Sequence, residues 1–267
     1  MLLLYGFLLA IFIALLAYRA RSLSKSGAFA SIFLGTIIFG LGGIPWAVLL
    51  LTFFFTSTAL SRAFKKRKQG LNEKYSKGDQ RDAGQVFGNG GLAAAFVLFH
   101  FFYPESNISW IGFAASLAAV NADTWATELG VLNPTPPHMI TNLRKRVEKG
   151  TSGGVSLVGT LASLAGSALI ALLATLLVPT DSLITVHWSL FPLITFAGLA
   201  GSLFDSLLGA TVQAMYFCPK DNKETEKHPL HTCGTETTHL RGWKWLTNDW
   251  VNFVCGGFGA VVAIVIR

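Results

Sequence analysis

Apolar residues form long stretches along this chain, and polar gaps separate them. The stretches cover residues 2–18, 27–44, 46–60, 88–103, 108–122, 154–178, 188–213 and 248–266. A helix needs about 20 residues to cross the hydrocarbon core of a bilayer, and about 17 is the lower limit. Most stretches reach that length with flanking neutral residues, whereas 46–60 is short enough for a re-entrant segment. The pattern predicts an all-α, polytopic membrane helix bundle with about eight transmembrane helices, and seven or nine as alternatives.

The composition supports this interpretation. Hydrophobic residues make up 52% of the 267 residues and charged residues only 13%, whereas a soluble domain carries roughly 25% charged residues. This excludes a water-soluble globule. We therefore treat residues 1–267 as a single integral membrane domain.

The 21 Lys and Arg residues predict the topology. All of them except Arg267 lie in the gaps at 19–26, 61–87, 131–150 and 214–247. With eight crossings these gaps lie on one side of the membrane, and the positive-inside rule makes that side the cytoplasm. We expect a plasma-membrane protein with both termini outside the cytoplasm and with cytoplasmic loops 61–87, 131–150 and 214–247. The net charge of +7 then needs no nucleic-acid partner to explain it.

Four acidic residues lie within or at the edge of apolar stretches: Asp123, Glu128, Asp205 and Asp249. A charged side chain costs about 2.5–3.5 kcal/mol at the bilayer centre, so each acid is a candidate functional group. The alternative is that these groups only hold helices together. That alternative is most open for Asp249, which lies near the expected membrane interface.

Asp123 and Asp205 lie on helix faces made of small residues. Gly112 and Ser116 precede Asp123 at helical spacing, and Gly201 and Gly209 flank Asp205. Small residues allow close helix packing, so both carboxylates should point into the bundle. Carboxylates suit Mg²⁺, which fills its other sites with water and phosphate oxygens. We predict a Mg²⁺ site at Asp123 and Asp205, with polar neighbours that bind substrate: Asn121, Thr124, Ser206, Asn248, Asp249 and Asn252.

The gap before the sixth stretch reads K-G-T-S-G-G-V-S at 149–156. Glycines let backbone N–H groups turn toward an anion, and a helix N-terminus adds a favourable dipole. No Walker A motif is present, so a plain flexible turn remains an alternative. We predict that Lys149 contacts phosphate, together with residues of the same loop: Gly150, Thr151, Ser152, Gly153, Gly154 and Ser156.

A polar stripe enters the fourth stretch and predicts a second wall of the site. Its members follow helical spacing into the apolar segment: Arg81, Asp82, Gln85 and Asn89.

The last loop contains two Cys and three His residues: Cys218, His228, His231, Cys233 and His239. These side chains could bind Zn²⁺, but no C-x-x-C pair is present and the spacing fits no standard finger. The pattern leaves the question of zinc open.

Five motifs together resemble those of one integral membrane family. They are G-N-G-G at 88–91, N-A-D-T-W-A-T-E-L-G at 121–130, K-G-T-S-G-G-V-S at 149–156, G-S-L-F-D-S-L-L-G-A at 201–210 and N-D-W-V-N at 248–252. The family was long described as a domain of unknown function, and it includes the plant phytyl-phosphate kinase of vitamin E synthesis. Its members tend to carry Cys and His in the last loop, where the set in this chain looks incomplete.

The resemblance implies a prenyl-phosphate kinase. Such an enzyme moves a phosphoryl group from a nucleoside triphosphate, CTP or ATP, to an isoprenoid monophosphate held in the lipid bilayer. On this interpretation Asp123, Glu128, Asp205 and Lys149 are the catalytic residues and Mg²⁺ is the cofactor. Two alternatives remain open. One is a cation- or proton-coupled transporter, in which the buried Asp residues bind cations or protons. The other is a CTP-dependent lipid cytidylyltransferase, which has similar site chemistry but releases pyrophosphate. The residue pattern distinguishes neither CTP from ATP nor one prenyl chain from another.

Overall fold

The computed structural model describes residues 1–64, 74, 80–179 and 187–267. These residues form eight α-helices, and a short π-helical turn at Ile38–Gly42 continues the second of them. The helices are α1 (Leu2–Arg19), α2 (Lys25–Ile37), α3 (Ile44–Ala63), α4 (Ala83–Phe102), α5 (Asn107–Gly130), α6 (Leu157–Leu176), α7 (Leu190–Thr211) and α8 (Asn248–Ile266).

Each helix coincides with one of the predicted apolar stretches, which confirms the helical membrane bundle. Within the described part of the chain, seven helices are long and apolar enough to cross a membrane, and α5 is the helix outside that set. Helix α3 has 20 residues, which corresponds to about 30 Å. That length favours a full crossing over the re-entrant segment considered for residues 46–60.

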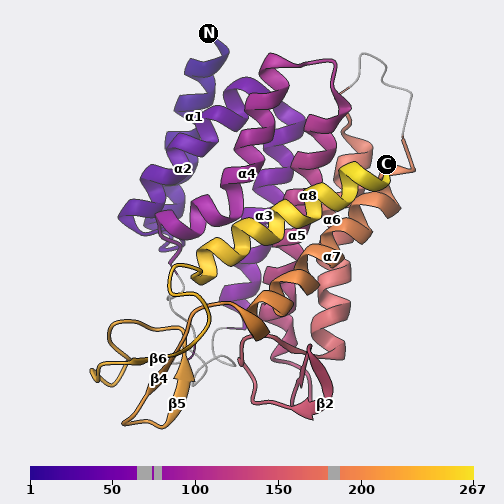
Figure 1. Ribbon diagram of the computed structural model, residues 1–267. Coiled ribbons are helices and arrows are strands. Elements are labelled where there is room, and N and C mark those ends of the chain that lie inside the picture. The colour runs from indigo at the N-terminus through magenta and orange to yellow at the C-terminus, as the bar shows by residue number, and fades with distance from the viewer. Residues whose placement is uncertain (65–73, 75–79, 180–186) are drawn as a thin grey trace.

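Helix α5 lies at the centre of the bundle (Figure 1). It packs against α3, α4, α6, α7 and α8, and every residue from Ser109 to Ala122 is buried. A helix enclosed by protein does not have to be apolar enough to face lipid. This is why α5 can carry Asn121, Asp123 and Glu128 in its C-terminal half.

Small residues let the central helices approach closely, as their spacing predicts. A Cβ added at Gly201 of α7 would lie 2.5 Å from the Cβ of Ala119 in α5. A Cβ added at Gly259 of α8 would lie 2.9 Å from the same Ala119 atom. Three helices therefore meet at one alanine, deep in the bundle.

Two small antiparallel sheets lie between α5 and α6 and between α7 and α8. The strands are β1 (His138–Met139), β2 (Asn142–Arg146), β3 (Gly154–Val155), β4 (Met215–Cys218), β5 (Lys223–Thr225) and β6 (Thr238–Arg241). All the strands except β3 fall in loops that were predicted as cytoplasmic, and β3 occupies the start of the stretch 154–178 that was predicted to be helical. The orders are β2–β1–β3 and β5–β4–β6. Both sheets lie at one end of the bundle, away from the two chain termini (Figure 1). The sequence indicated no strands here, because they are only two to five residues long and show no apolar alternation.

Candidate active site

A cavity of about 460 Å³ lies where the helices meet the loops at the sheet end of the bundle. Most of the residues predicted for the site line it. They are Arg81, Gln85, Asn89, Asp123, Thr124, Glu128, Lys149, Gly150, Thr151, Ser152, Gly153, Gly154, Ser156, Asp205, Ser206, Asn248 and Asn252. Helices α3 to α8 and the loops beside them, far apart in sequence, therefore contribute to a single polar chamber.

Three predicted residues do not line this cavity. Asp82 caps the N-terminus of α4, where its side chain accepts a hydrogen bond from the backbone N–H of Gln85. Asn121 is buried, and its Nδ2 donates to the backbone carbonyl of Gly166 in α6 at 2.7 Å. Asp249 lies in the first turn of α8 with a buried Oδ1. In this structure Asp82 and Asn121 thus make contacts that stabilise helices.

Three carboxylates line the cavity together. Asp123 comes from α5, Asp205 from α7, and Glu226 follows β5. All three interact electrostatically with one another. Asp205 Oδ2 is inaccessible to solvent and has no hydrogen-bond partner among the described residues. Like charges held together in a buried place favour a bound cation, and an all-oxygen donor set fits Mg²⁺.

Glu226 was missed by the sequence analysis. It lies in a polar loop, where an acidic residue looks like an ordinary solvated charge. Its position comes from tertiary contacts: Gln213 Nε2 donates to Glu226 Oε1 at 2.9 Å, and Ser152 Oγ donates to Gln213 Oε1 at 3.1 Å. Residues 149–156 form a loop that we call the glycine loop. The two hydrogen bonds connect the glycine loop to the last loop (214–247) through Gln213, which follows α7.

Cationic side chains also line the cavity. The guanidinium of Arg81 donates to Thr58 Oγ1 and to Ser57 Oγ, both at 2.9 Å. Burial lowers the pKa of Arg81 to about 10, and the nearby Glu128 carboxylate partly offsets this decrease. Arg81 therefore stays protonated at neutral pH. Arg21 and Arg62 also line the cavity. The sequence analysis counted both only as topology signals.

The glycine loop reaches the cavity in a conformation that glycine favours. Gly150 and Gly153 have φ angles of 78° and 84°, in the region that side chains with a Cβ rarely adopt. The loop ends at Ser156, whose hydroxyl accepts from the backbone N–H of Gly159 and caps α6. The N-terminus of α6 therefore opens directly onto the cavity, where its dipole favours an anion.

Lys149 connects this loop to the end of α5. Its Nζ donates to the backbone carbonyls of Val131 at 3.1 Å and Asn133 at 2.6 Å. A lysine ammonium has three donors, so one N–H can still reach a ligand in the cavity. Lys149 thus has a structural contact in addition to its predicted contact with phosphate.

Comparisons with known proteins agree with this architecture. The sequence model of the family described as "Integral membrane protein DUF92" matches residues 8–260. The chain is 34% identical over 271 residues to Protein PGR of Arabidopsis thaliana, covering 94% of this chain and 91% of that protein. It is 34% identical over 200 residues to the uncharacterized membrane protein MJ0933 of Methanocaldococcus jannaschii, covering 74% and 78% respectively.

A more distant plant relative is Protein VTE6, chloroplastic, of Arabidopsis thaliana. The identity is 28% over 254 residues, which cover 92% of this chain and 65% of that protein. No solved structure matches the chain significantly.

Proposed function

The chain belongs to the DUF92 family of integral membrane proteins, and from this premise we propose that it is a membrane-embedded prenyl-phosphate kinase. In the proposed reaction an oxygen of an isoprenoid monophosphate attacks the γ-phosphorus of CTP or ATP. The bond to the β-phosphate breaks, the nucleoside diphosphate leaves, and a prenyl diphosphate forms. The observation that carries the proposal is the cavity, which three carboxylates line together with a glycine loop and several cations.

Phosphoryl transfer depends on positioning and charge neutralisation more than on covalent chemistry by the protein. Asp123, Asp205 and Glu226 would hold Mg²⁺, which neutralises phosphate charge when bound. Arg81 and Lys149 line the same cavity and would bind phosphate oxygens. The acceptor is already an ionised phosphate, so the reaction needs no strong general base.

A second, apolar pocket supports a lipid acceptor. It has a volume of about 80 Å³, and its apolar lining comes from α1 to α4 and the π-helical turn, with side chains such as Leu34, Leu50 and Phe53. It shares Arg81, Gln85 and Asn89 with the polar cavity. The start of an isoprenoid chain would lie in this pocket while its phosphate lies beside Arg81. The remaining chain would stay in the bilayer.

Purified protein incubated with a prenyl phosphate and labelled CTP or ATP tests the proposal. Formation of prenyl diphosphate and nucleoside diphosphate would establish a kinase. Formation of a CDP-lipid with release of pyrophosphate would establish a cytidylyltransferase instead. Absence of turnover with both nucleotides and several prenyl chain lengths would contradict both enzymes and favour a carrier.

We expect Lys149→Ala to raise the KM for nucleotide or prenyl phosphate, because it removes a cation that faces the cavity. Lys149→Arg keeps the charge and should retain more activity. Lys145→Ala is the matched control, since Lys145 is exposed on β2 in the same loop and should leave both constants unchanged. Steady-state kinetics on the three variants provide the measurement. Unchanged KM and kcat in Lys149→Ala would remove this lysine from the site.

We also propose that the sheet end of the bundle faces the cytoplasm. Glu105→Cys, in the loop between α4 and α5, should then react with an impermeant maleimide on intact cells. Lys145→Cys should react only after the cells are permeabilised. The parent protein measures the background from Cys218, Cys233 and Cys255. Labelling of Lys145→Cys in intact cells would show that the sheet end faces outward. The cavity would then not be open to cytosolic nucleotide, and the proposed orientation would be wrong.

A further inference from the structure

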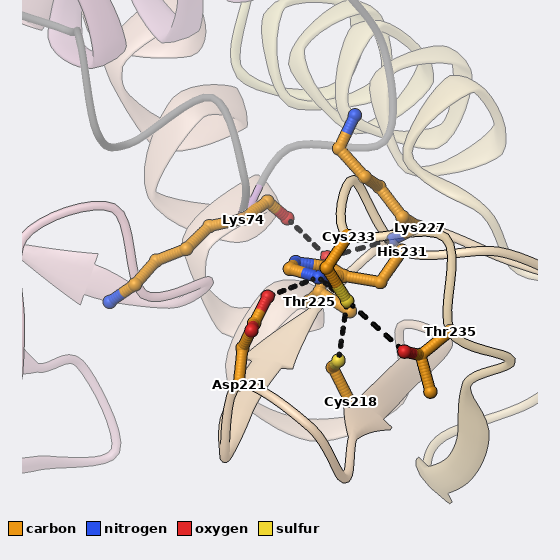
Figure 2. A network of polar contacts seen from close by, with 8 residues as sticks. All are labelled: Lys74, Cys218, Asp221, Thr225, Lys227, His231, Cys233 and Thr235. Atoms are coloured by element: carbon orange, nitrogen blue, oxygen red, sulfur yellow. Dashed lines mark hydrogen bonds and ion pairs between the residues drawn. The ribbon is translucent and has the colours of Figure 1, made fainter.

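Four potential metal ligands meet in the last loop, outside the cavity. Cys218 ends β4, Asp221 lies in the turn between β4 and β5, and His231 and Cys233 lie in the segment between β5 and β6. Each of the four offers one ligand atom, and these atoms all lie within 4.8 Å of one another. Figure 2 shows the four side chains pointing toward a common centre.

The distances within this cluster resemble those of a tetrahedral metal site. His231 Nδ1 lies 3.0 Å from Asp221 Oδ2 and 3.4 Å from Cys233 Sγ. The Sγ atoms of Cys218 and Cys233 are 3.5 Å apart. With Zn–S bonds of about 2.3 Å and Zn–N bonds of about 2.0 Å, ligand atoms around tetrahedral zinc are separated by roughly 3.3–3.8 Å. The side chains therefore need to move only slightly to bind zinc.

We propose that Cys218, Asp221, His231 and Cys233 bind one structural Zn²⁺ ion. Two sulfur ligands select zinc over Mg²⁺ or Ca²⁺, which prefer oxygen. Four protein ligands complete a tetrahedron and leave no open position for a substrate, which is typical of structural rather than catalytic zinc.

One further observation supports the ligand set. Asp221 follows Cys218 at the spacing of a C-x-x-C pair, with aspartate in the second position. The sequence analysis sought only cysteine at that position and so left zinc open.

The other two histidines of this loop have different contacts. The ring of His228 stacks on Tyr216 with centroids 4.4 Å apart, and His239 Nε2 lies 3.0 Å from the backbone carbonyl of Gly242. Neither belongs to the cluster. They therefore serve as matched controls for His231.

Zinc would fix the strand that leads to Glu226. Strand β5 follows the Asp221 turn and ends at Thr225, and Glu226 is the next residue. Thr225 and Glu226 both contact the backbone carbonyl of Lys74. Figure 2 includes Lys74 and Thr225 beside the cluster. The bound ion would hold this segment so that the Glu226 carboxylate reaches the cavity. This consequence rests on the proposed function, whereas zinc binding itself does not.

Metal analysis of the full-length protein, purified in detergent from zinc-supplemented cells, tests the proposal. We expect about one zinc ion per chain, as in other closed four-ligand sites. His231→Ala and Cys233→Ala should each lower the zinc content at least about tenfold, because a metal site with one ligand removed binds weakly. His228→Ala and Cys255→Ala should keep the wild-type content, since Cys255 is buried in α8.

Wild-type protein that holds no zinc, and takes up none after chelation and zinc addition, would overturn the proposal. So would zinc content that is unchanged in folded His231→Ala and Cys233→Ala, or a disulfide between Cys218 and Cys233 in freshly purified protein. If the variants aggregate, the wild-type protein can be loaded with Co²⁺ in place of zinc. Absorption from thiolate-to-cobalt charge transfer would then support the site, and its absence would contradict it. Zinc content is independent of turnover, so failure of the kinase assay would leave this result intact.

Discussion

Replacing Asp205 or Asp123 by Asn is expected to lower turnover by at least about a hundredfold, the scale of losing one preorganised electrostatic group. The amide keeps the size of the side chain and removes one negative charge. Asp205 Oδ2 is buried without a hydrogen-bond partner among the described residues, so a bound cation would account for its charge. Turnover measured against Mg²⁺ concentration should show a higher half-saturation point as well as a lower maximum.

Asp82→Asn is the matched control for these two variants. It makes the same chemical change at the same end of the bundle, but Asp82 caps α4 and does not line the cavity. Asparagine caps helices as well as aspartate does, so activity should stay near that of the wild type. If Asp123→Asn and Asp205→Asn fold normally and retain most of their activity, the metal role is wrong. Loss of folding in both would instead assign them to helix packing.

Gly153→Val is expected to abolish activity and to reduce the yield of folded protein. The φ angle of Gly153 is 84°, which β-branched residues avoid. An added Cβ would also lie 2.5 Å from the Cβ of Ala210 in α7. The loop would have to move away from α7, and residues 150–154 would no longer line the cavity. Thermal unfolding in detergent and turnover provide the two measurements.

Gly43→Val is a control that separates the backbone strain in Gly153→Val from its steric clash with Ala210. Gly43 has a φ of 81°, and nothing lies within 4 Å of its added Cβ. Its ψ of −164° places Gly43 in a backbone region that is essentially restricted to glycine. The variant should therefore show only the conformational cost, roughly 1–3 kcal/mol. The double variant Gly153→Ala with Ala210→Gly should recover part of the stability that Gly153→Ala loses, because the two sites are in contact. Equal losses at Gly153 and Gly43, with no recovery, would mean that packing against α7 is unimportant.

The helices of this protein follow from its sequence because a bilayer permits few alternatives. Backbone N–H and C=O groups have no water to bind in the hydrocarbon core, so an apolar stretch of sufficient length must be helical. For residues 46–60 this reasoning predicts a helix but not its exact bounds. The helix there runs from Ile44 to Ala63, because serine, threonine and arginine at its end remain helical although they lower the local hydropathy. The two small sheets have no comparable constraint, and the sequence did not indicate them.

The residues of the candidate site fall into the same two groups, those in apolar stretches and those in polar loops. Asp123 and Asp205 could be recognised from sequence, because a charge inside an apolar stretch is costly and therefore conspicuous. Glu226, Arg21 and Arg62 lie among other charges in polar loops, where such residues cost nothing and carry no signal. Only the tertiary structure brings them to the cavity, and only it places Asp221 beside Cys218, His231 and Cys233. The sequence determined which helices form and which acids they bury, since both depend on local hydrophobicity, whereas the loop residues were decided by long-range contacts.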